Sequence, residues 1–187
     1  MLVGVLALQG DFREHAAMVR SIGHEAREVR TAADLEGIEA LILPGGESTT
    51  IGMLAEQYQL IEPLRAAISA GLPTLGTCAG MILLAGNTAD GSDQHQLDVL
   101  DVVVERNAFG RQVDSFEQEI EIVGWDAPMM AVFIRAPWIT KAANDVEILA
   151  EWDGHPVMVR QGNIIATAFH PELTTDTRVH RMFLEEV

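Results

Sequence analysis

The chain has 187 residues, of which 48% are hydrophobic and 21% charged, and its formal net charge at pH 7 is −16. This length predicts a single domain, residues 1–187, with a substantial buried core. The negative charge argues against nucleic acid as a partner, because phosphate binding needs a basic surface. No apolar run approaches the roughly 20 residues that a membrane-spanning helix needs, so we expect no membrane segment.

The N-terminal part of the chain alternates short apolar runs with helical patterns. Leu2–Leu8 is nearly all apolar and has no basic segment before it, so we expect a buried strand rather than a secretion signal. Asp11 is expected to cap a helix that runs to about Ile22. Further strands are expected at His24–Arg30, at Glu39–Leu43 and in the run that ends at Gly76. Further helices are expected at Thr31–Glu36, from Ser48, at Ile61–Ala70 and from Ala79 to Ala85.

The C-terminal half is expected to consist mainly of strands. Gly86–Gln96 lacks apolar periodicity and is expected to be a polar loop. Asp153–Gly154 predicts a hairpin turn, and Thr175–Glu186 a closing helix. Thr140–Asp145, which holds the only lysine, is expected to be a surface loop. The expected strands are Leu97–Glu105, Phe116–Val123, Ala131–Ala136, Val146–Trp152, Pro156–Arg160 and Asn163–Phe169.

This order of elements predicts an α/β fold, a three-layer, mostly parallel and doubly wound sheet with right-handed crossovers and a β-rich C-terminal half. In such sheets, ligands bind at the carboxyl ends of the strands. Gly45–Gly46 and Cys78 each follow an expected strand, so we expect both at this edge of the sheet.

Cys78 is the only cysteine and lies in the segment Gly76-Thr-Cys-Ala-Gly80, between an expected strand and an expected helix. This segment is similar to a nucleophile elbow in which cysteine replaces serine. Its two glycines remove the Cβ atoms that would crowd so sharp a turn, and a helix N-terminus favours a thiolate. We therefore interpret Cys78 as a nucleophile rather than as a small buried hydrophobic residue. A single cysteine permits no internal disulfide, which predicts a cytoplasmic location.

His170 is the best candidate for the base that a cysteine nucleophile needs, because it ends an apolar run and is followed by proline and Glu172. Proline biases the residue before it towards extended backbone, in which side chains two residues apart project to the same side. Glu172 is therefore expected to orient His170. The other histidines, among them His15, lie in helical, polar or mixed surroundings. We expect the N–H groups of Gly46 and Ala79 to form an oxyanion hole.

Several segments together carry a resemblance to a known family. They are Leu6–His15 (LALQGDFREH), Leu43–Thr49 (LPGGEST), Gly76–Gly80 (GTCAG), Arg106–Glu117 (RNAFGRQVDSFE), Val132–Pro137 (VFIRAP) and Phe169–Leu173 (FHPEL). The chain resembles the triad glutamine amidotransferases and, more narrowly, the glutaminase subunits of pyridoxal 5′-phosphate synthase. Arg106–Glu117 is the most specific segment, because other glutaminases of this class lack it. In one departure, the family usually has glycine where this chain has Gln96–Asp98.

The resemblance implies that the chain hydrolyses L-glutamine to glutamate and ammonia without a cofactor or metal, and passes the ammonia to a separate synthase subunit. It implies that Cys78 is the nucleophile, His170 the base and Glu172 the orienting acid. The implied substrate-binding residues are Gly46, Glu47, Ser48, Arg106, Ile134 and Arg135. The implied docking face includes the turn Gln9, Gly10 and Asp11, and we expect docking to flip the Gly45–Gly46 peptide and so activate an otherwise poor glutaminase.

Other functions remain compatible with the same residues. A glutaminase that serves another acceptor, such as imidazole or anthranilate synthesis, would use the same triad. A cysteine peptidase or amidase of the same fold, and a non-catalytic binding module, are further alternatives. Release of glutamate from glutamine, compared with cleavage of peptides, distinguishes the peptidase or amidase. The segment Arg106–Glu117 and the identity of the partner distinguish a glutaminase that serves another acceptor.

Overall fold

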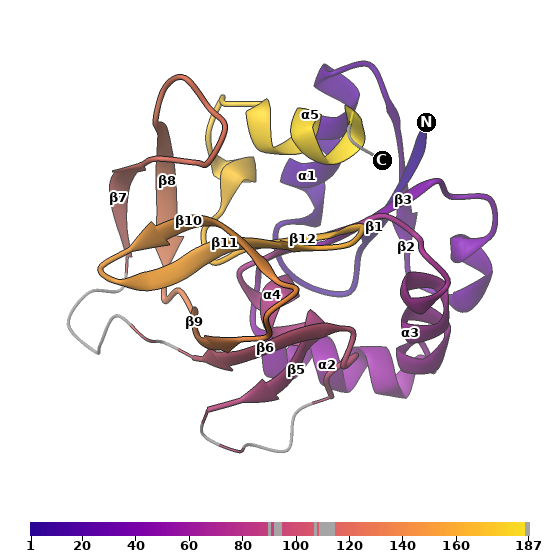
Figure 1. Cartoon of the computed structure of the whole chain (residues 1–187). Coiled ribbons are helices and arrows are strands. Elements are labelled where there is room, and N and C mark those ends of the chain that lie inside the picture. Colours follow the sequence, from indigo (N-terminus) through magenta and orange to yellow (C-terminus); the bar gives the residue numbers. More distant parts are fainter. Residues whose placement is uncertain (90, 92–94, 107, 109–114, 186–187) are drawn as a thin grey trace.

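The computed structural model describes residues 1–187 except 90, 92–94, 107, 109–114 and 186–187 (Figure 1). The helices are α1 Phe12–Ser21, α2 Ser48–Gln57, α3 Ile61–Ser69, α4 Ala79–Leu84 and α5 Arg178–Glu185, with short 3₁₀ turns η1 Ala32–Leu35 and η2 Pro171–Leu173. The strands are β1 Leu2–Leu6, β2 Glu25–Val29, β3 Ala40–Leu43, β4 Thr74–Thr77, β5 Ala85–Thr88, β6 Leu100–Glu105, β7 Ser115–Ile120, β8 Met129–Ile134, β9 Trp138–Ala142, β10 Glu147–Trp152, β11 His155–Gln161 and β12 Ile164–Thr167. Strands and helices alternate as far as α4, and strands dominate from there to α5, as the sequence predicts.

The central sheet has seven strands in the order β10-β11-β12-β4-β3-β1-β2. From β12 to β2 the neighbouring strands are parallel, whereas β11 is antiparallel to both of its neighbours. β12 comes from near the end of the chain and pairs with β4, so the two halves of the chain build one sheet. Two smaller sheets, β5-β6-β9 and β7-β8, complete the fold.

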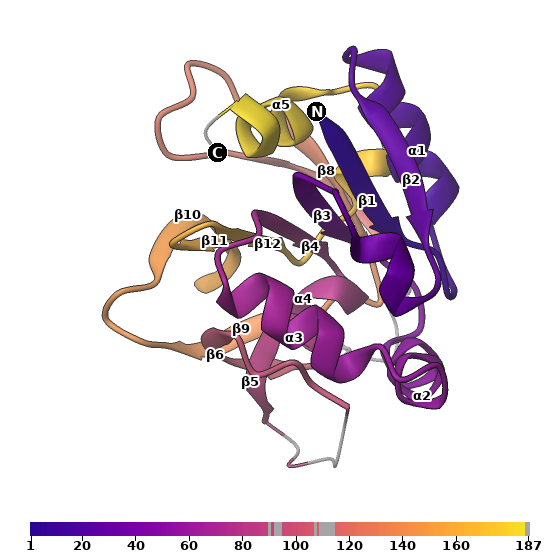
Figure 2. The same cartoon turned by 90° about the vertical axis from the view of Figure 1, so that its right-hand side faces the viewer.

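Helices cover both faces of the central sheet. In both views α1 and α5 lie on one face, and α3 and α4 lie on the other (Figures 1 and 2). Every residue of β3, β4 and β12 is buried between these layers. Strands that are covered on both faces need a continuous apolar sequence, such as the Ala-Leu-Ile-Leu of β3. The predicted three-layer, mostly parallel α/β fold is confirmed.

Two segments differ from the expectation. Ala85–Thr88 forms strand β5 beside β6, although a polar loop was expected from Gly86. Lys141 lies on strand β9, which also pairs with β6, and not in a loop, although it is exposed as expected. Both strands lie outside the central sheet and contain polar residues, so they lack the continuous apolar run that reveals a strand of its interior.

Positive φ angles occur at a predicted hairpin turn and in the segment Gln96–Asp98, where this chain departs from the family. Asp153 and Gly154 take φ angles of 51° and 76°, as a two-residue type I′ hairpin requires, and they connect β10 to β11. Asp98 takes a φ of 51°, the left-handed region that glycine favours. Aspartate tolerates this region better than most residues, which explains how the chain manages without glycine here. None of the helices in the described part of the chain is long and apolar enough to cross a membrane.

Candidate active site

Cys78 forms a sharp turn between β4 and α4. Its φ of 48° and ψ of −101° lie outside the regions that L-residues ordinarily adopt. The turn needs glycine on both sides of the cysteine. A Cβ on Gly76 would lie 2.4 Å from a methyl group of Leu84, and one on Gly80 would lie 1.9 Å from the carbonyl oxygen of Leu43. The backbone here has the geometry of the nucleophile elbow that the sequence predicts.

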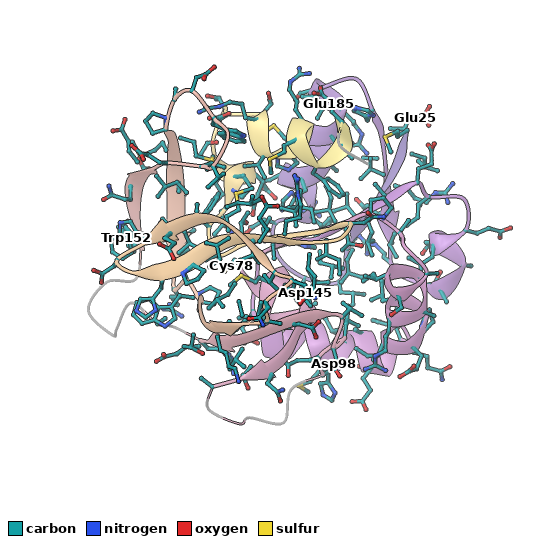
Figure 3. The ribbon with its side chains drawn as sticks, viewed as in Figure 1. Glu25, Cys78, Asp98, Asp145, Trp152 and Glu185 are labelled. Atoms are coloured by element: carbon teal, nitrogen blue, oxygen red, sulfur yellow. The ribbon has the colours of Figure 1, made fainter. Side chains whose placement is uncertain are left out.

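The segments predicted to form the site all follow parallel strands that are adjacent in the central sheet. Across β12, β4, β3 and β1, the segments that follow contain His170, Cys78, Gly45–Gly46 and Asp11. The carboxyl ends of parallel strands meet at one edge, so strand order alone brings these segments together. Figure 3 shows Cys78 within the fold, and its side chain is buried.

His170 lies beside Cys78 and two carboxylates. Its Nδ1 is 2.8 Å from Oε1 of Glu172 and 3.3 Å from Oδ2 of Asp11. The Cys78 sulfur, which interacts with this imidazole, is 3.9 Å from the carbonyl oxygen of Ile134. The side chains of His170 and Glu172 are 4% and 0% exposed. Their contact was expected, but Glu172 lies in the 3₁₀ turn η2 and not in extended chain.

These groups shift one another's pKa. Burial lowers the pKa of His170, but hydrogen bonds to Asp11, Cys78 and Glu172 outweigh it and raise this pKa to about 12. Burial raises the pKa of the Glu172 carboxyl, but His15 and His170 outweigh it and hold this pKa well below its usual range. His170 is therefore a cation and Glu172 an anion at neutral pH. An imidazolium beside a thiol favours the thiolate.

Asp11 differs in part from the expectation. It precedes α1, but its carboxylate makes no capping hydrogen bond and faces His170 instead. Nδ1 of His170 and one oxygen each of Asp11 and Glu172 lie within 4.8 Å of one another, a spacing that would also suit a metal ion. A proton on Nδ1 accounts for this geometry without a metal, because it can be donated to either carboxylate.

The glycine loop approaches the turn that precedes α1. The Asp11 N–H donates to the carbonyl oxygen of Gly45 at 3.1 Å. Since C=O and N–H point in opposite directions in a trans peptide, the Gly46 N–H points away from Asp11. A Cβ on Gly10 would lie 1.9 Å from the Gly45 oxygen, so this approach requires glycine. Ala79 is the first residue of α4, where backbone N–H groups have no partner within the helix.

A cavity of about 400 Å³ opens beside Cys78. Its walls contain every residue that was predicted to bind substrate, together with the nucleophile and the base. Asp11 and Ile82 also line it, although neither was predicted to bind substrate. The lining residues are Asp11, Gly46, Glu47, Ser48, Cys78, Ile82, Arg106, Ile134, Arg135 and His170. This volume is within the range of small-molecule sites.

Glu47 and Arg106 form the polar wall of this cavity. The Glu47 carboxylate caps α2 by accepting from the N–H groups of Thr49 and Thr50 at 3.2 and 2.7 Å. Burial raises the Glu47 pKa, but these hydrogen bonds outweigh it and lower this pKa. Nη2 of Arg106 lies 3.6 Å from Oε1 of Glu47 and donates to the Thr49 hydroxyl at 3.3 Å. The Glu47 N–H donates to Oε1 of Gln9 at 2.8 Å, which ties this wall to the turn before α1.

Ile134 and Arg135 form the opposite wall, at the end of β8. The His170 N–H donates to the Val132 carbonyl oxygen at 2.9 Å, which holds β8 beside the base. Arg135 has a φ of 43°, so the chain turns sharply where it lines the cavity. The family-specific segment Arg106–Glu117 lies mostly outside the described residues; its residues 106, 108 and 115–117 are described.

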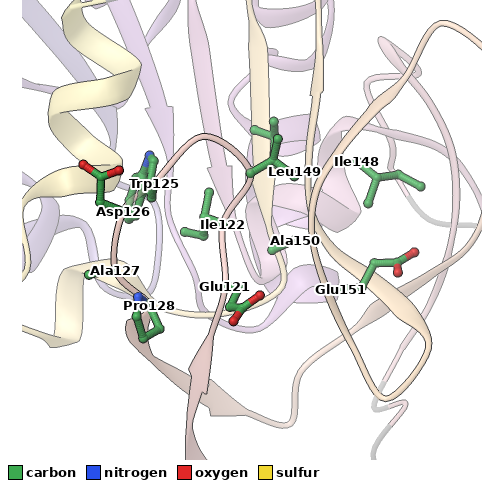
Figure 4. A pocket seen from close by; sticks show the side chains of 11 residues that line it. Glu121, Ile122, Trp125, Asp126, Ala127, Pro128, Ile148, Leu149, Ala150 and Glu151 are labelled. Carbon is green, nitrogen blue, oxygen red and sulfur yellow. The ribbon is translucent and has the colours of Figure 1, made fainter.

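A larger cavity, of about 720 Å³, lies elsewhere, between the segment 121–128 and β10 (Figure 4). Its walls carry the carboxylates of Glu121, Asp126 and Glu151 around an apolar floor. Among the described residues that line it there is no thiol, hydroxyl, histidine or cation. The described residues around this cavity therefore contain no pair of thiol and imidazole such as Cys78 and His170.

Two buried histidines near the site were not predicted. His15 on α1 and His180 on α5 are both fully buried and lie 2.9 Å apart, measured from Nδ1 of His15 to Nε2 of His180. His15 also lies 3.3 Å from Glu172. A histidine on the apolar face of a helical pattern was the available signal, since Ala16 and Val19 share this buried face.

Comparisons with known proteins agree with this geometry. The model of the SNO glutamine amidotransferase family matches residues 5–187. The chain belongs to this family. It is 56% identical to the pyridoxal 5′-phosphate synthase subunit PdxT of Mycolicibacterium vanbaalenii over 97% of this chain and 95% of that protein. It is 57% identical to the PdxT subunit of Frankia alni over 99% of this chain and 94% of that protein.

A solved structure of a glutamine amidotransferase is also similar to this member of the family. It superposes with a TM-score of 0.93 at 53% identity, and the match covers 98% of this chain and 97% of the other. The resemblance that the sequence motifs carry is therefore confirmed at the level of the family and of the fold.

Proposed function

We propose that the chain is the glutaminase subunit of a pyridoxal 5′-phosphate synthase. It hydrolyses L-glutamine to L-glutamate and ammonia, and the ammonia is used by a separate synthase subunit. The observation that carries this proposal is the convergence of Cys78, His170 and Glu172 at a cavity lined by the predicted substrate residues. The high identity to PdxT subunits over nearly the whole chain supports the same role.

In the first half of the reaction, the Cys78 sulfur attacks the carboxamide carbon of glutamine. The C–S bond forms as the carbonyl oxygen becomes an oxyanion, which the N–H groups of Gly46 and Ala79 stabilise. His170 carries the proton that the leaving nitrogen needs, because its raised pKa keeps it protonated. The C–N bond then breaks, and ammonia leaves a glutamyl thioester.

In the second half, water hydrolyses the thioester. His170, which has lost its proton to the ammonia, takes a proton from the attacking water and keeps it, and the sulfur leaves as a thiolate when the C–S bond breaks. Glu172 accepts the Nδ1–H of His170 throughout and stabilises its charged form, without itself taking the proton. Glutamate leaves, and the thiolate–imidazolium pair is restored.

The cavity walls match the two charged groups on the α-carbon of glutamine. Arg106 and Arg135 offer guanidinium groups to the α-carboxylate, and Glu47 offers its carboxylate to the α-ammonium. Glu47 can do this while it caps α2, because a carboxylate has about four acceptor positions. Ser48 and Ile134 complete the walls that fit the side chain.

The proposed docking face includes the turn Gln9–Asp11. This turn contacts the glycine loop directly, since the Asp11 N–H binds the Gly45 carbonyl oxygen. Flipping the Gly45–Gly46 peptide must break this bond, so a partner that engages the turn can change the orientation of the Gly46 N–H. One missing oxyanion donor lowers turnover by roughly 10²–10³-fold, which would keep the free subunit nearly silent.

We further propose that residues 1–187 form one glutaminase domain, because β12 completes the same sheet as β4. The proposed location is the cytoplasm, which suits a chain whose single cysteine serves as a thiolate.

The test is steady-state release of glutamate from glutamine by the purified chain, alone and with the synthase subunit. We expect release to rise roughly 10²–10³-fold when the synthase subunit is present. Equal rates would contradict the docking switch. Cleavage of peptides in place of glutamine would identify a peptidase, and activation by an imidazole or anthranilate synthase instead would change the partner.

A further inference from the structure

Two buried histidines connect to the carboxylate of the proposed triad. His15 Nε2 lies 3.3 Å from Oε2 of Glu172 and 3.0 Å from the hydroxyl of Thr77. On the other side of its ring, His15 Nδ1 lies 2.9 Å from Nε2 of His180. The two histidines come from α1 and α5, which lie on the same face of the sheet (Figures 1 and 2). Both are 0% exposed, so water cannot replace either contact.

The Glu172 carboxylate needs a second donor. Oε1 accepts the Nδ1–H of His170, but Oε2 is buried and makes no well-aligned hydrogen bond to any of the described residues. A buried anion whose oxygens lack donors is strongly destabilising. His15 approaches Oε2 through its Nε2, at 3.3 Å. A proton on this nitrogen can be donated to the Thr77 hydroxyl at 3.0 Å and also places positive charge near the carboxylate, 3.3 Å away.

The charge of Glu172, 3.3 Å from Nε2, indicates which nitrogen of His15 carries the proton. If Nε2 carries the hydrogen, Nδ1 accepts from the Nε2–H of His180, and the bare Nδ1 of His180 needs no partner. None of the described residues does partner this nitrogen. If Nε2 were bare, it could accept from the Thr77 hydroxyl, but its lone pair would also face the Glu172 anion, and His180 would bury an unpartnered N–H. The geometry therefore favours one direction, from His180 to His15 and from His15 to Glu172.

The same nitrogen of His15 also reaches the glycine loop through one further residue. The Thr77 hydroxyl, 3.0 Å from His15 Nε2, accepts the N–H of Gly45 at 3.0 Å. The backbone N–H of His15 donates to the Asp11 carbonyl oxygen, in the proposed docking turn. His15 thus contacts the Glu172 carboxylate, the Thr77 hydroxyl that binds the glycine loop, and the turn before α1.

We propose that His15 is a positioning residue of the glutaminase centre, which holds Glu172 against His170 through its Nε2–H, and that His180 orients His15. This inference rests on the proposed function. Without His15, the Glu172 carboxylate loses the donor that fixes its plane. Nδ1 of His170 then has an alternative partner in Asp11, whose Oδ2 already lies 3.3 Å away. An imidazole that turns towards Asp11 holds its other nitrogen less well at the sulfur and the leaving group, so that activity falls without being abolished.

The test compares His15→Gln with His15→Asn in the complex with the synthase subunit. The glutamine amide NH₂ can take the place of Nε2–H, whereas the shorter asparagine places its amide near Nδ1 and leaves Glu172 without a donor. We expect His15→Asn to lower kcat about 10–100-fold and His15→Gln to retain kcat within about five-fold. KM for glutamine should stay within about two-fold in both variants, because His15 does not line the cavity.

A second comparison places His15→Asn in a Glu172→Gln background. If His15 acts through Glu172, its substitution costs less than about two-fold there, because effects within one unit are not additive. Equal kcat values for His15→Asn and His15→Gln would overturn the proposal. So would a fold-loss for His15→Asn that is the same with Glu172 and with Glu172→Gln. Absence of glutamate release by the wild-type complex would instead contradict the proposed function, so the two failures are distinct.

Discussion

Two of the cavities among the described residues differ in how their walls are built. The smaller, of about 400 Å³, lies where adjacent parallel strands end, and there a thiol, an imidazole and a glycine loop converge. The larger, of about 720 Å³, is walled by the segment 121–128 and β10, and its described walls carry carboxylates without a nucleophile. Reactive groups gather where strand order brings strand ends together, and the volume of a cavity does not reveal this.

The cavities differ also in what lies behind their walls. Behind the smaller one, the ionisable side chains of Glu172, His15 and His180 are buried and hold one another. Around the larger one, the carboxylates of Glu121 and Glu151 are exposed to solvent. Buried charge is destabilising unless it is paired, so the first arrangement persists only because its members are positioned together.

The largest expected effect is that of Cys78→Ala, which should remove all but on the order of 10⁻⁶ of the glutamate release. Alanine fits the elbow, whose backbone is set by flanking glycines, so we expect glutamine to bind with nearly unchanged affinity. Isothermal titration with glutamine checks binding, and release of glutamate checks turnover. Measurable turnover by this variant would show that the smaller cavity is not the reactive one.

The next effect is that of Glu172→Gln, which we expect to lower kcat by up to about 10⁴-fold and by less than His170→Asn does. The carboxylate orients His170 and stabilises its cation, whereas His170 itself moves the proton. Asp11 also faces Nδ1 of His170, at 3.3 Å, and should preserve part of the activity.

The control for this prediction is Asp11→Asn. Alone it should change kcat by only a few-fold, since the Glu172 contact is shorter, 2.8 Å against 3.3 Å. Combined with Glu172→Gln it should remove the residual activity. A wild-type rate for Glu172→Gln at saturating partner would exclude Glu172 from the triad.

The contrast between the cavities also explains what the sequence could reveal. The elbow around Cys78 is a local pattern, in which glycines flank a cysteine between a strand and a helix, and it appears directly in the sequence. The alternation of strands and helices implies a parallel sheet, and a parallel sheet brings the ends of β12, β4 and β3 together. The position of the site therefore followed from local patterns and one topological rule.

Contacts between distant side chains could not be predicted in this way. His15 and His180 are separated by 165 positions, and nothing near either one indicates the other. Asp11 looked like a helix cap because of its position before α1, but its carboxylate contacts His170. Such contacts depend on how α1 and α5 pack on the sheet, and a pattern of hydrophobic residues fixes which face of a helix is buried but not its partners.

Buried ionisable groups behind the smaller cavity predict a loss of stability in mild acid. Burial and then the neighbouring His15 lower the pKa of His180, Glu172 opposes them, and together they bring this pKa to about 3. Between pH 6.5 and about 3 the unfolded chain binds a proton at His180 that the folded chain does not. The free energy of unfolding therefore falls as pH falls, by up to about 1.4 kcal/mol per pH unit from this group.

Urea unfolding of wild type and His180→Leu at pH 7.0, 6.0 and 5.0 measures this contribution. Leucine cannot titrate, so the variant should lose less stability than wild type over the same interval, whatever its stability at pH 7.0. Parallel losses in the two proteins would show that His180 is protonated in the folded state.

The smallest expected effect comes from the larger cavity, where Glu151→Gln should leave glutamate release within about two-fold of wild type. Glu151 is exposed and lines a cavity without a described nucleophile. Its counterpart is Glu47→Gln, the same chemical change in the wall of the smaller cavity. There we expect KM for glutamine to rise at least about ten-fold, because a neutral amide cannot pair with the α-ammonium. Both variants are assayed with the synthase subunit present. A rise in KM for Glu151→Gln that equals the rise for Glu47→Gln would mean that both cavities take part in binding glutamine.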